Sequence, residues 1–270
     1  MTTIPFALNH MTAPALPVKD FFALAASLGI SAVEIRNDLE GNAIIDGTPA
    51  AAVRDLAERH GLTIISINAL QRFNEWNGDR AREAEELVTY ARECGAKALV
   101  LVPVNDGSGQ GDGERQANLR QALTALKPML DEAGIVGLVE PLGFEICSLR
   151  SKTEAAEGIR AVKGEGTFKL VHDTFHHHLA GEEIFHPELT GLVHISGVAD
   201  PAVTVSDMRD PHRVLVGAGD RLDNAGQMKR LRESGYAGPF SFEPFSPDVH
   251  QLSNVEAALR DSMAFLASRA

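Results

Sequence analysis

Short apolar segments alternate with amphipathic segments from one end of the chain to the other. The apolar segments are rich in Val, Ile and Leu and carry no polar face, which is typical of parallel strands that helices cover on both sides. We expect strands at residues 5–11, 32–37, 63–70, 96–104, 135–143, 168–175, 191–198 and 239–245. We expect helices at residues 18–29, 48–61, 79–94, 115–133, 152–162, near Ala180, and at 224–233 and 254–267. The pattern therefore predicts a series of strand–helix units.

These units follow one another without a linker or a change in composition. Such a series predicts one closed (β/α)₈ TIM barrel, a single domain over residues 1–270. A doubly wound open sheet is the alternative, but its dinucleotide site would need a glycine-rich turn after the first strand, where this chain has His10 to Ala13. The glycine-rich loop NDGSGQGDG follows the fourth strand without a GKS or GKT ending, so we interpret it as a loop of the active-site face.

Polar residues stand where the strands end, which is where this barrel carries its catalytic groups. Glu34 and Arg36 end the second strand and Asn68 ends the third. The last four strands end in Glu140, Asp173, His194 and Glu243. A charge that points into an apolar barrel must be paired or bound to a metal. Any one of the four could be an ordinary ion-pair or core residue, but together they predict one site for a divalent metal ion, Mn²⁺, Zn²⁺, Mg²⁺ or Co²⁺.

The segment FKLVHDTFHHH places several histidines around Asp173. His172 precedes Asp173, so strand alternation turns it away from the ion. His176 lies beyond the strand end, where it can face a substrate or relay a proton. We expect His177 and His178 to lie mostly at the surface or behind the ligands.

Charge and composition limit the classes of molecule that the protein is expected to bind. A net charge of −12 argues against a nucleic-acid partner, which would favour a basic surface. The N-terminus lacks the pattern of a signal peptide, and no apolar stretch is long enough to span a membrane. Cys94 and Cys147 sit in no paired motif and are expected to be reduced thiols. We therefore expect a cytoplasmic protein with a small-molecule sugar or polyol substrate; the sequence leaves a homo-oligomer open.

The motifs VEPLG, HDTFHH, VHISG and SFEPF resemble those of the xylose isomerase-like (sugar phosphate isomerase/epimerase) barrel superfamily over the whole chain. The resemblance implies that Glu140, Asp173, His194 and Glu243 hold a divalent metal, and that His176 is the usual histidine three residues after the aspartate. VEIRND, SINALQRFNEW and GFEICSLRSKTEA are similar to segments of inosose isomerases (2-keto-myo-inositol isomerases) of inositol catabolism. The resemblance thus implies an isomerase of carbohydrate metabolism.

The ligand set suits this chemistry. A metal bound to a ketone oxygen and the neighbouring hydroxyl acidifies the C–H between them and stabilises an enediolate. We expect Glu140 and Glu243 to move the proton, with His176 as an alternative relay. Hydroxyl or enediolate donors are expected at Arg36, Asn68, Arg150 and Arg213. The resemblance to inosose isomerases implies that the reaction moves the carbonyl of 2-keto-myo-inositol to give 1-keto-D-chiro-inositol.

Several other functions remain in view. An inosose dehydratase would begin with the same proton abstraction and then expel a hydroxyl. A hydroxypyruvate or ketose isomerase, or an epimerase, would use a smaller or open-chain substrate. An endonuclease IV-like enzyme would need more histidine ligands and a basic surface, which the net charge of −12 argues against. A non-catalytic sugar-binding barrel would leave the four strand-end ligands unexplained.

Overall fold

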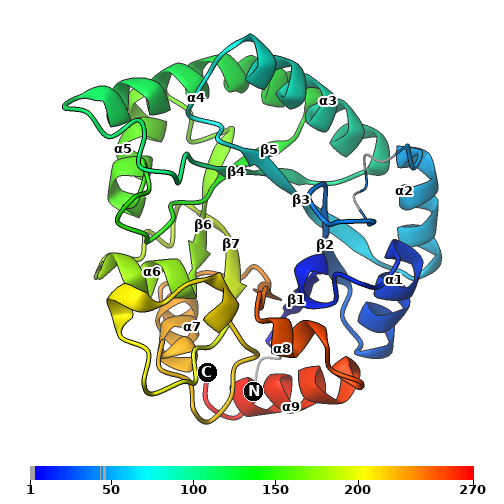
Figure 1. Cartoon of the computed structure of the whole chain (residues 1–270). Coiled ribbons are helices and arrows are strands. Elements are labelled where there is room, and N and C mark those ends of the chain that lie inside the picture. Colours follow the sequence, from blue (N-terminus) through cyan, green and yellow to red (C-terminus); the bar gives the residue numbers. More distant parts are fainter. Residues whose placement is uncertain (1–3, 43, 45–46) are drawn as a thin grey trace.

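The computed structural model describes residues 4–42, 44 and 47–270. Parallel strands form a closed barrel in sequence order, and the last strand pairs with the first (Figure 1). The strands are β1 (Phe6–Asn9), β2 (Ala32–Arg36), β3 (Thr63–Gln71), β4 (Ala98–Val102), β5 (Val136–Val139), β6 (Phe168–Asp173), β7 (Thr190–Ile195) and β8 (Phe240–Phe242). The predicted barrel is confirmed, and the open sheet is excluded because β1 and β8 are paired.

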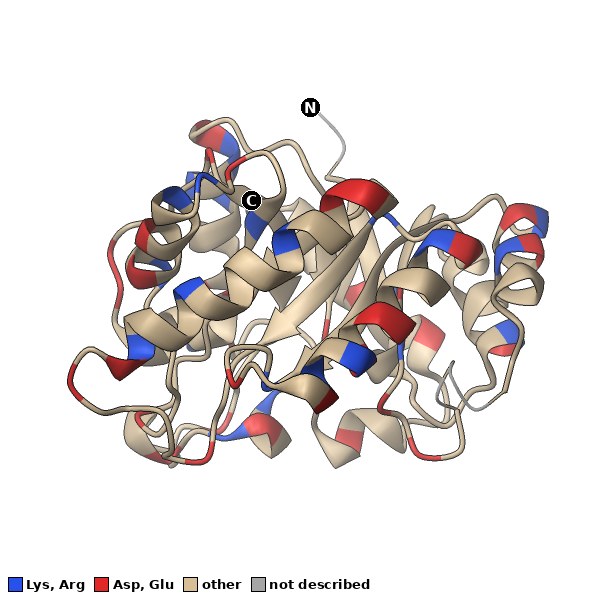
Figure 2. Cartoon of the chain, turned by 90° about the horizontal axis from the view of Figure 1, so that it is seen from above, with Lys and Arg blue, Asp and Glu red and all other residues tan. Residues whose placement is uncertain are grey.

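Helices form a ring around the barrel (Figure 1). They are α1 (Val18–Ser27), α2 (Ala50–Arg59), α3 (Gly78–Cys94), α4 (Glu114–Ala133), α5 (Lys152–Ala161), α6 (Thr174–Ala180), α7 (Asn224–Glu233), the short α8 (Pro247–His250) and α9 (Val255–Ala267). Short 3₁₀ turns lie at His10–Thr12, Val205–Asp207 and Asp210–His212. Lys and Arg alternate with Asp and Glu along the outer helices in the view of Figure 2. In the described ranges, no helix is both long and apolar enough to cross a bilayer.

Most strands are shorter than predicted, and for β6 the structure shows the reason. β6 ends at Asp173 rather than continuing to Phe175, and α6 follows at once. The reason is that Asp173 caps α6: its Oδ1 accepts hydrogen bonds from the backbone N–H of Phe175 (2.7 Å) and His176 (3.1 Å). The run of histidines is therefore helical.

The barrel interior changes from apolar to polar along the strands. Inside the barrel, before the strand ends, buried apolar side chains pack together: Ala69, Ala98, Val100, Leu138, Val171 and Leu192. Because side chains alternate along a strand, residues two positions further on share this inner face. Asp173 lies two residues after Val171, Glu140 two after Leu138 and His194 two after Leu192. The strands thus place these three polar groups at the carboxyl end of the barrel.

The segment after β5 packs directly against α6. A Cβ atom on Gly143 would lie 2.3 Å from the carbonyl oxygen of His176 and 2.6 Å from Cβ of Leu179, so only glycine fits there. Leu142 and Phe144 on either side join Phe175 in a second buried cluster above the barrel. This contact fixes α6 relative to the end of β5.

Candidate metal centre

The four predicted ligands meet at the carboxyl end of the barrel. Glu140 follows β5, Asp173 ends β6, His194 lies near the end of β7 and Glu243 follows β8. All four are buried, and one potential ligand atom from each lies within 4.8 Å of the others. In the part of the chain that the structure describes, this quartet is the only group of three or more His, Cys, Asp and Glu residues so arranged. It is a buried cluster able to hold a metal ion.

The ring of His194 is held from both sides. Its Nδ1 lies 2.9 Å from Oε1 of Glu140 and 3.2 Å from Oε2 of Glu243, while its Nε2 lies 3.2 Å from Oε2 of Glu34. In the neutral ring with Nε2–H donating to Glu34, Nδ1 presents a lone pair on the side of the three carboxylates, as a metal ligand must. Three carboxylates and one imidazole form a donor set that suits Mn²⁺, Zn²⁺, Mg²⁺ or Co²⁺.

Glu34 is the functional residue whose role the sequence did not reveal. It is fully buried and accepts hydrogen bonds from Ser66 Oγ (2.5 Å), Asn68 Nδ2 (2.8 Å) and the hydroxyl of Ser241. Burial would raise the pKa of Glu34, but His194 outweighs it and lowers that pKa. Glu34 is therefore an ionised anchor for the imidazole. The only sequence signal was an acid within the apolar segment AVEIR.

Two buried arginines bind the quartet from the side. Nη2 of Arg213 lies 2.6 Å from Oδ2 of Asp173 and 2.9 Å from Oε2 of Glu243. Nη1 of Arg36 lies 2.8 Å from Oε1 of Glu243, and its other nitrogens bind Asp38. Both arginines, predicted as substrate donors, thus reach the site while bound to its carboxylates. Contact with a substrate stays a prediction for each.

The site's pKa values show how strongly these charges act on one another. Burial raises the pKa of Glu140. Burial would raise that of Glu243 as well, but His194 and the arginines hold it well below its usual range. Burial alone would lower the pKa of His194, yet the surrounding carboxylates, Glu243 foremost, raise it well above its usual value. Excess negative charge thus holds protons that a divalent cation can replace.

A cavity of about 350 Å³, the barrel-mouth cavity, opens over these groups, with Glu140, Glu243, Asn68, Arg36 and Arg213 in its lining. His176 also lines it and is 5% exposed. Among the described residues, Nδ1 of His176 has no hydrogen-bond partner. Its ring meets Phe144 edge-on, with the ring centroids 5.1 Å apart. His176 is therefore placed to contact a molecule in this cavity, as its predicted role requires.

Arg150 does not join the other predicted donors. Its guanidinium donates to the carbonyl oxygens of Gly143 (2.7 Å) and Leu179 (2.8 Å), and it is absent from the lining of the barrel-mouth cavity. These bonds tie the segment after β5 to α6. The structure thus gives Arg150 a bracing contact, and nothing in it supports the predicted contact with substrate.

The outer histidines differ partly from expectation. His172 points away from the quartet, as alternation predicts, and contacts Lys152. His177, expected at the surface or behind the ligands, is only 8% exposed because it packs against Lys152 and Phe185. His178 is half-buried.

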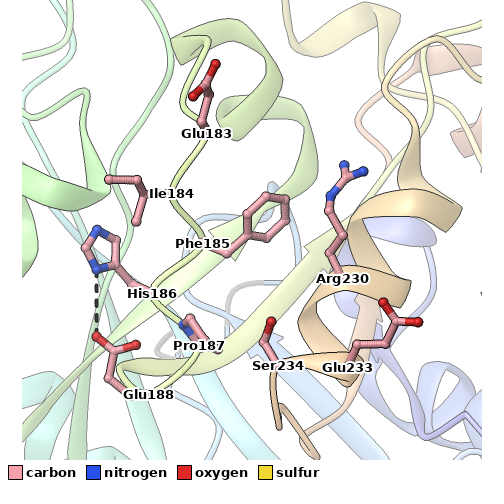
Figure 3. Close-up of a pocket in the computed structure, with 9 residues that line it drawn as sticks. All are labelled: Glu183, Ile184, Phe185, His186, Pro187, Glu188, Arg230, Glu233 and Ser234. Carbon is pink, nitrogen blue, oxygen red and sulfur yellow. Dashed lines mark ion pairs between the residues drawn. The ribbon is translucent and has the colours of Figure 1, made fainter.

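A larger cavity, of about 520 Å³, lies between the α6–β7 segment and the end of α7 (Figure 3). Phe185, His186, Arg230 and Glu233 line it, and His186 pairs with Glu188. Segments that lead from a helix into a strand lie at the amino end of the barrel, opposite the catalytic face. None of the quartet lines this cavity, so size alone does not locate the active site.

The fold agrees with the comparisons. The sequence model of the xylose isomerase-like TIM barrel family matches residues 22–269, and the chain belongs to this family. The chain is 29% identical over 205 residues to an inosose isomerase from Halalkalibacterium halodurans, a match that covers 72% of this chain and 70% of that one.

Solved structures show the same fold. A xylose isomerase domain-containing protein from Salmonella typhimurium LT2 superposes with a TM-score of 0.91 at 35% identity, covering 98% of this chain and 99% of that one. A protein named IolI, solved with a zinc atom bound, superposes with a TM-score of 0.87 at 21% identity, covering 98% of each chain. The second likeness shows the fold alone.

Proposed function

We propose that this protein is a metal-dependent isomerase that moves a carbonyl on a cyclic polyol ketone, converting 2-keto-myo-inositol to 1-keto-D-chiro-inositol through an enediolate. The buried quartet beneath the barrel-mouth cavity carries the proposal. The inosose isomerases of Halalkalibacterium halodurans and Bacillus subtilis, 29% and 25% identical, support the choice of substrate.

In this proposal Glu140, Asp173, His194 and Glu243 hold one divalent ion. The ion, when bound, polarises the ketone and the neighbouring hydroxyl and so acidifies the C–H between them. Glu34 keeps the imidazole of His194 in the orientation that leaves Nδ1 free. Phe144 and Leu142 line the cavity and keep water from part of the substrate.

Glu140 is the freer of the two glutamates. Glu243 is held at Oε1 by Asn9 (3.2 Å) and Arg36 (2.8 Å), and at Oε2 by Arg213. In the described structure, Glu140 receives a side-chain hydrogen bond only from His194. Its second oxygen can therefore turn to a substrate carbon. We assign the proton transfers to Glu140 and Glu243, with His176 as the alternative relay.

The charges of the cavity favour a neutral substrate. The described residues that line it include three arginines and no lysine, and every arginine is bound to at least two carboxylates. The partners are Asp38 and Glu243 for Arg36, Glu75 and Asp106 for Arg72, and Asp173, Asp210 and Glu243 for Arg213. A phosphate or carboxylate would find no unpaired guanidinium here. A polyol ketone therefore fits better than hydroxypyruvate.

The proposal is tested by incubating Mn²⁺-loaded protein with 2-keto-myo-inositol in D₂O and following the reaction by NMR. The expected result is a new inosose that carries deuterium. Formation of a diketone with loss of water would replace the isomerase by a dehydratase. No exchange, while hydroxypyruvate or a ketose is converted, would overturn the inosose assignment. The Asp173→Asn variant is the matched control and should show no reaction.

A further inference from the structure

A second buried polar cluster lies on the outer face of β6, behind the quartet. It joins the first residue of α5, a residue of β6, one of α6 and one of α7: Lys152, His172, His177 and Gln227. We call these residues the Lys152 cluster. Lys152 is 3% exposed, His172 is fully buried and Gln227 is 2% exposed.

The hydrogen bonds of this cluster run in one direction. Nζ of Lys152 lies 2.8 Å from Nδ1 of His172 and 2.8 Å from Nδ1 of His177. Because the protonated amine has only donors, both Nδ1 atoms accept and both rings carry their proton on Nε2. His172 then donates from Nε2 to Oε1 of Gln227 over 2.8 Å. The amide nitrogen of Gln227 donates to the carbonyl oxygens of Thr174 (3.1 Å) and Leu222 (2.7 Å).

This chain of bonds holds the backbone on both sides of Asp173. His172 precedes Asp173, and Thr174 follows it. Because Asp173 uses Oδ1 to cap α6, its Oδ2 is the oxygen that faces His194 Nδ1, at 3.9 Å. A shift of residues 172–174 would move Oδ2 directly. The Lys152 cluster therefore acts on the orientation of one member of the quartet.

Burying a lysine here is unfavourable and needs a reason. Burial lowers the pKa of Lys152 to about 7. Among the described residues, Lys152 has no carboxylate within ion-pair distance, and its Nζ lies 5.3 Å from the centre of the Phe185 ring. A buried cation in such a site is commonly less stable than an apolar side chain of similar size. Packing alone would therefore favour methionine at this position, whereas the donor chain requires the amine.

We propose that Lys152 is a positioning residue for the metal centre, acting through His172 and Gln227 to hold Asp173 in the orientation that the ion requires. This inference rests on the proposed function in taking Asp173 as a metal ligand. Residues that orient metal ligands from behind typically change metal affinity by about 10–100-fold when they are replaced. The same range is expected for Lys152.

The test is a titration of metal-free Lys152→Met with Co²⁺, followed by the visible absorption of the bound ion. We expect binding weaker by about 10–100-fold and an altered absorption spectrum, because Asp173 is no longer held in place. Lys169→Met is the matched control: Lys169 also lies on β6, is half-buried and, among the described residues, donates only to the carbonyl of Glu188. It should keep the wild-type affinity and spectrum.

Thermal unfolding of the metal-free protein separates a positioning role for Lys152 from a purely structural one. If Lys152 positions Asp173, the Lys152→Met variant should unfold at the same temperature as the wild type or higher, because a buried cation has been removed. If Lys152 is purely structural, the variant should unfold at a lower temperature. Weaker Co²⁺ binding without loss of stability supports positioning. Weaker Co²⁺ binding that is accompanied by a lower unfolding temperature would overturn the positioning role. Unchanged Co²⁺ binding would overturn it as well.

A second variant keeps the test decisive if Lys152→Met does not fold. Gln227→Met breaks the same chain one step closer to Thr174 and should give the same spectral change. In a double variant the two losses of affinity should not add, because both substitutions break one chain. Wild-type protein that binds no Co²⁺ would refute the metal centre and the proposed function. If the wild type binds Co²⁺ and both variants bind it equally well, the positioning role of Lys152 is refuted but the metal centre is not.

Discussion

The two faces of β6 carry buried polar clusters that differ in how their charges balance. On the inner face, Asp173 belongs to a group of three carboxylates around one imidazole, which Arg36 and Arg213 partly neutralise and whose ligand atoms lie within 4.8 Å of one another. On the outer face, His172 belongs to a cluster in which one amine donates to two histidines and His172 in turn donates to Gln227. The inner cluster gathers ligand atoms that a divalent cation can bind, whereas the outer one already holds a cation, Lys152, among neutral acceptors. A buried polar cluster indicates a metal site when carboxylate and imidazole ligand atoms converge in it, and not merely because it is buried and polar.

The largest effect is expected on the inner face. Glu140→Gln should lose the bound metal and one proton-transfer group, so activity should fall by about 10³-fold or more. Asp173→Asn should also lose metal, as measured by elemental analysis of the purified protein. The matched control is Glu145→Gln, an exposed carboxylate in the same segment, which should keep both metal and activity. Undiminished metal in both ligand variants would refute the quartet.

A smaller loss of metal affinity is expected when Glu34, which holds the ring of His194, is replaced. Glu34→Gln keeps the size of the side chain but removes the charge that fixes the imidazole ring. Metal affinity should fall by about 10–100-fold while the protein stays folded. Isothermal titration with Mn²⁺ measures the change, and Glu40→Gln, an exposed site, is the control. Equal affinities for Glu34→Gln and wild type would contradict the anchoring role.

The outer face predicts an unusual dependence of stability on pH. Lys152 faces His172 and His177, with the carboxylates of Glu182 and Asp173 further away, and burial lowers its pKa from 10.5 to about 7. Between these values the unfolded chain holds a proton that the folded chain has lost, so raising the pH stabilises the fold. Below about pH 7 both states hold the proton, and the folded state bears the full desolvation of the cation.

Urea denaturation of metal-free protein measures this dependence. The stability of the wild type relative to Lys152→Met should rise between about pH 7 and about pH 10, by several kcal/mol at most. The same slope in wild type and variant would show that Lys152 keeps its ordinary pKa. Lys169→Met should follow the wild type.

The smallest effect concerns Arg150, which braces α6 from the side of Gly143. Arg150→Met removes two hydrogen bonds from a charged donor and should lower the free energy of unfolding by about 1–3 kcal/mol. KM for the polyol ketone should stay close to the wild-type value, because Arg150 does not line the barrel-mouth cavity. A large rise in KM without loss of stability would restore the substrate role predicted from sequence.

The ligands on the inner face of β6 and its neighbouring strands could be predicted from the sequence, because their placement depends on short-range features of each strand. Strand alternation and the position of strand ends place Glu140, Asp173 and His194 on one face and at one height. The role of Glu34 could not be predicted in this way. Its contact with His194 crosses the barrel between residues far apart in sequence, and its distance depends on how the strands tilt and pair.

The outer face was predicted less well because its partners are not local. Lys152 would be expected at the surface from its charge, yet it supplies the donor that lets His172 and His177 be buried. Arg150 was predicted to face a substrate, but the carbonyl groups that it binds become neighbours only when α6 packs on the segment after β5. The end of β6 was missed because the cap formed by Asp173 is a property of the folded turn.

The close packing of Gly143 against α6 limits how this protein can change over time. Every side chain larger than hydrogen would push on the backbone of His176 and on Leu179, and through α6 on the turn that holds Asp173. In a library that samples all substitutions, position 143 should therefore tolerate as few residues as the ligands do, although it contributes no side chain to the chemistry.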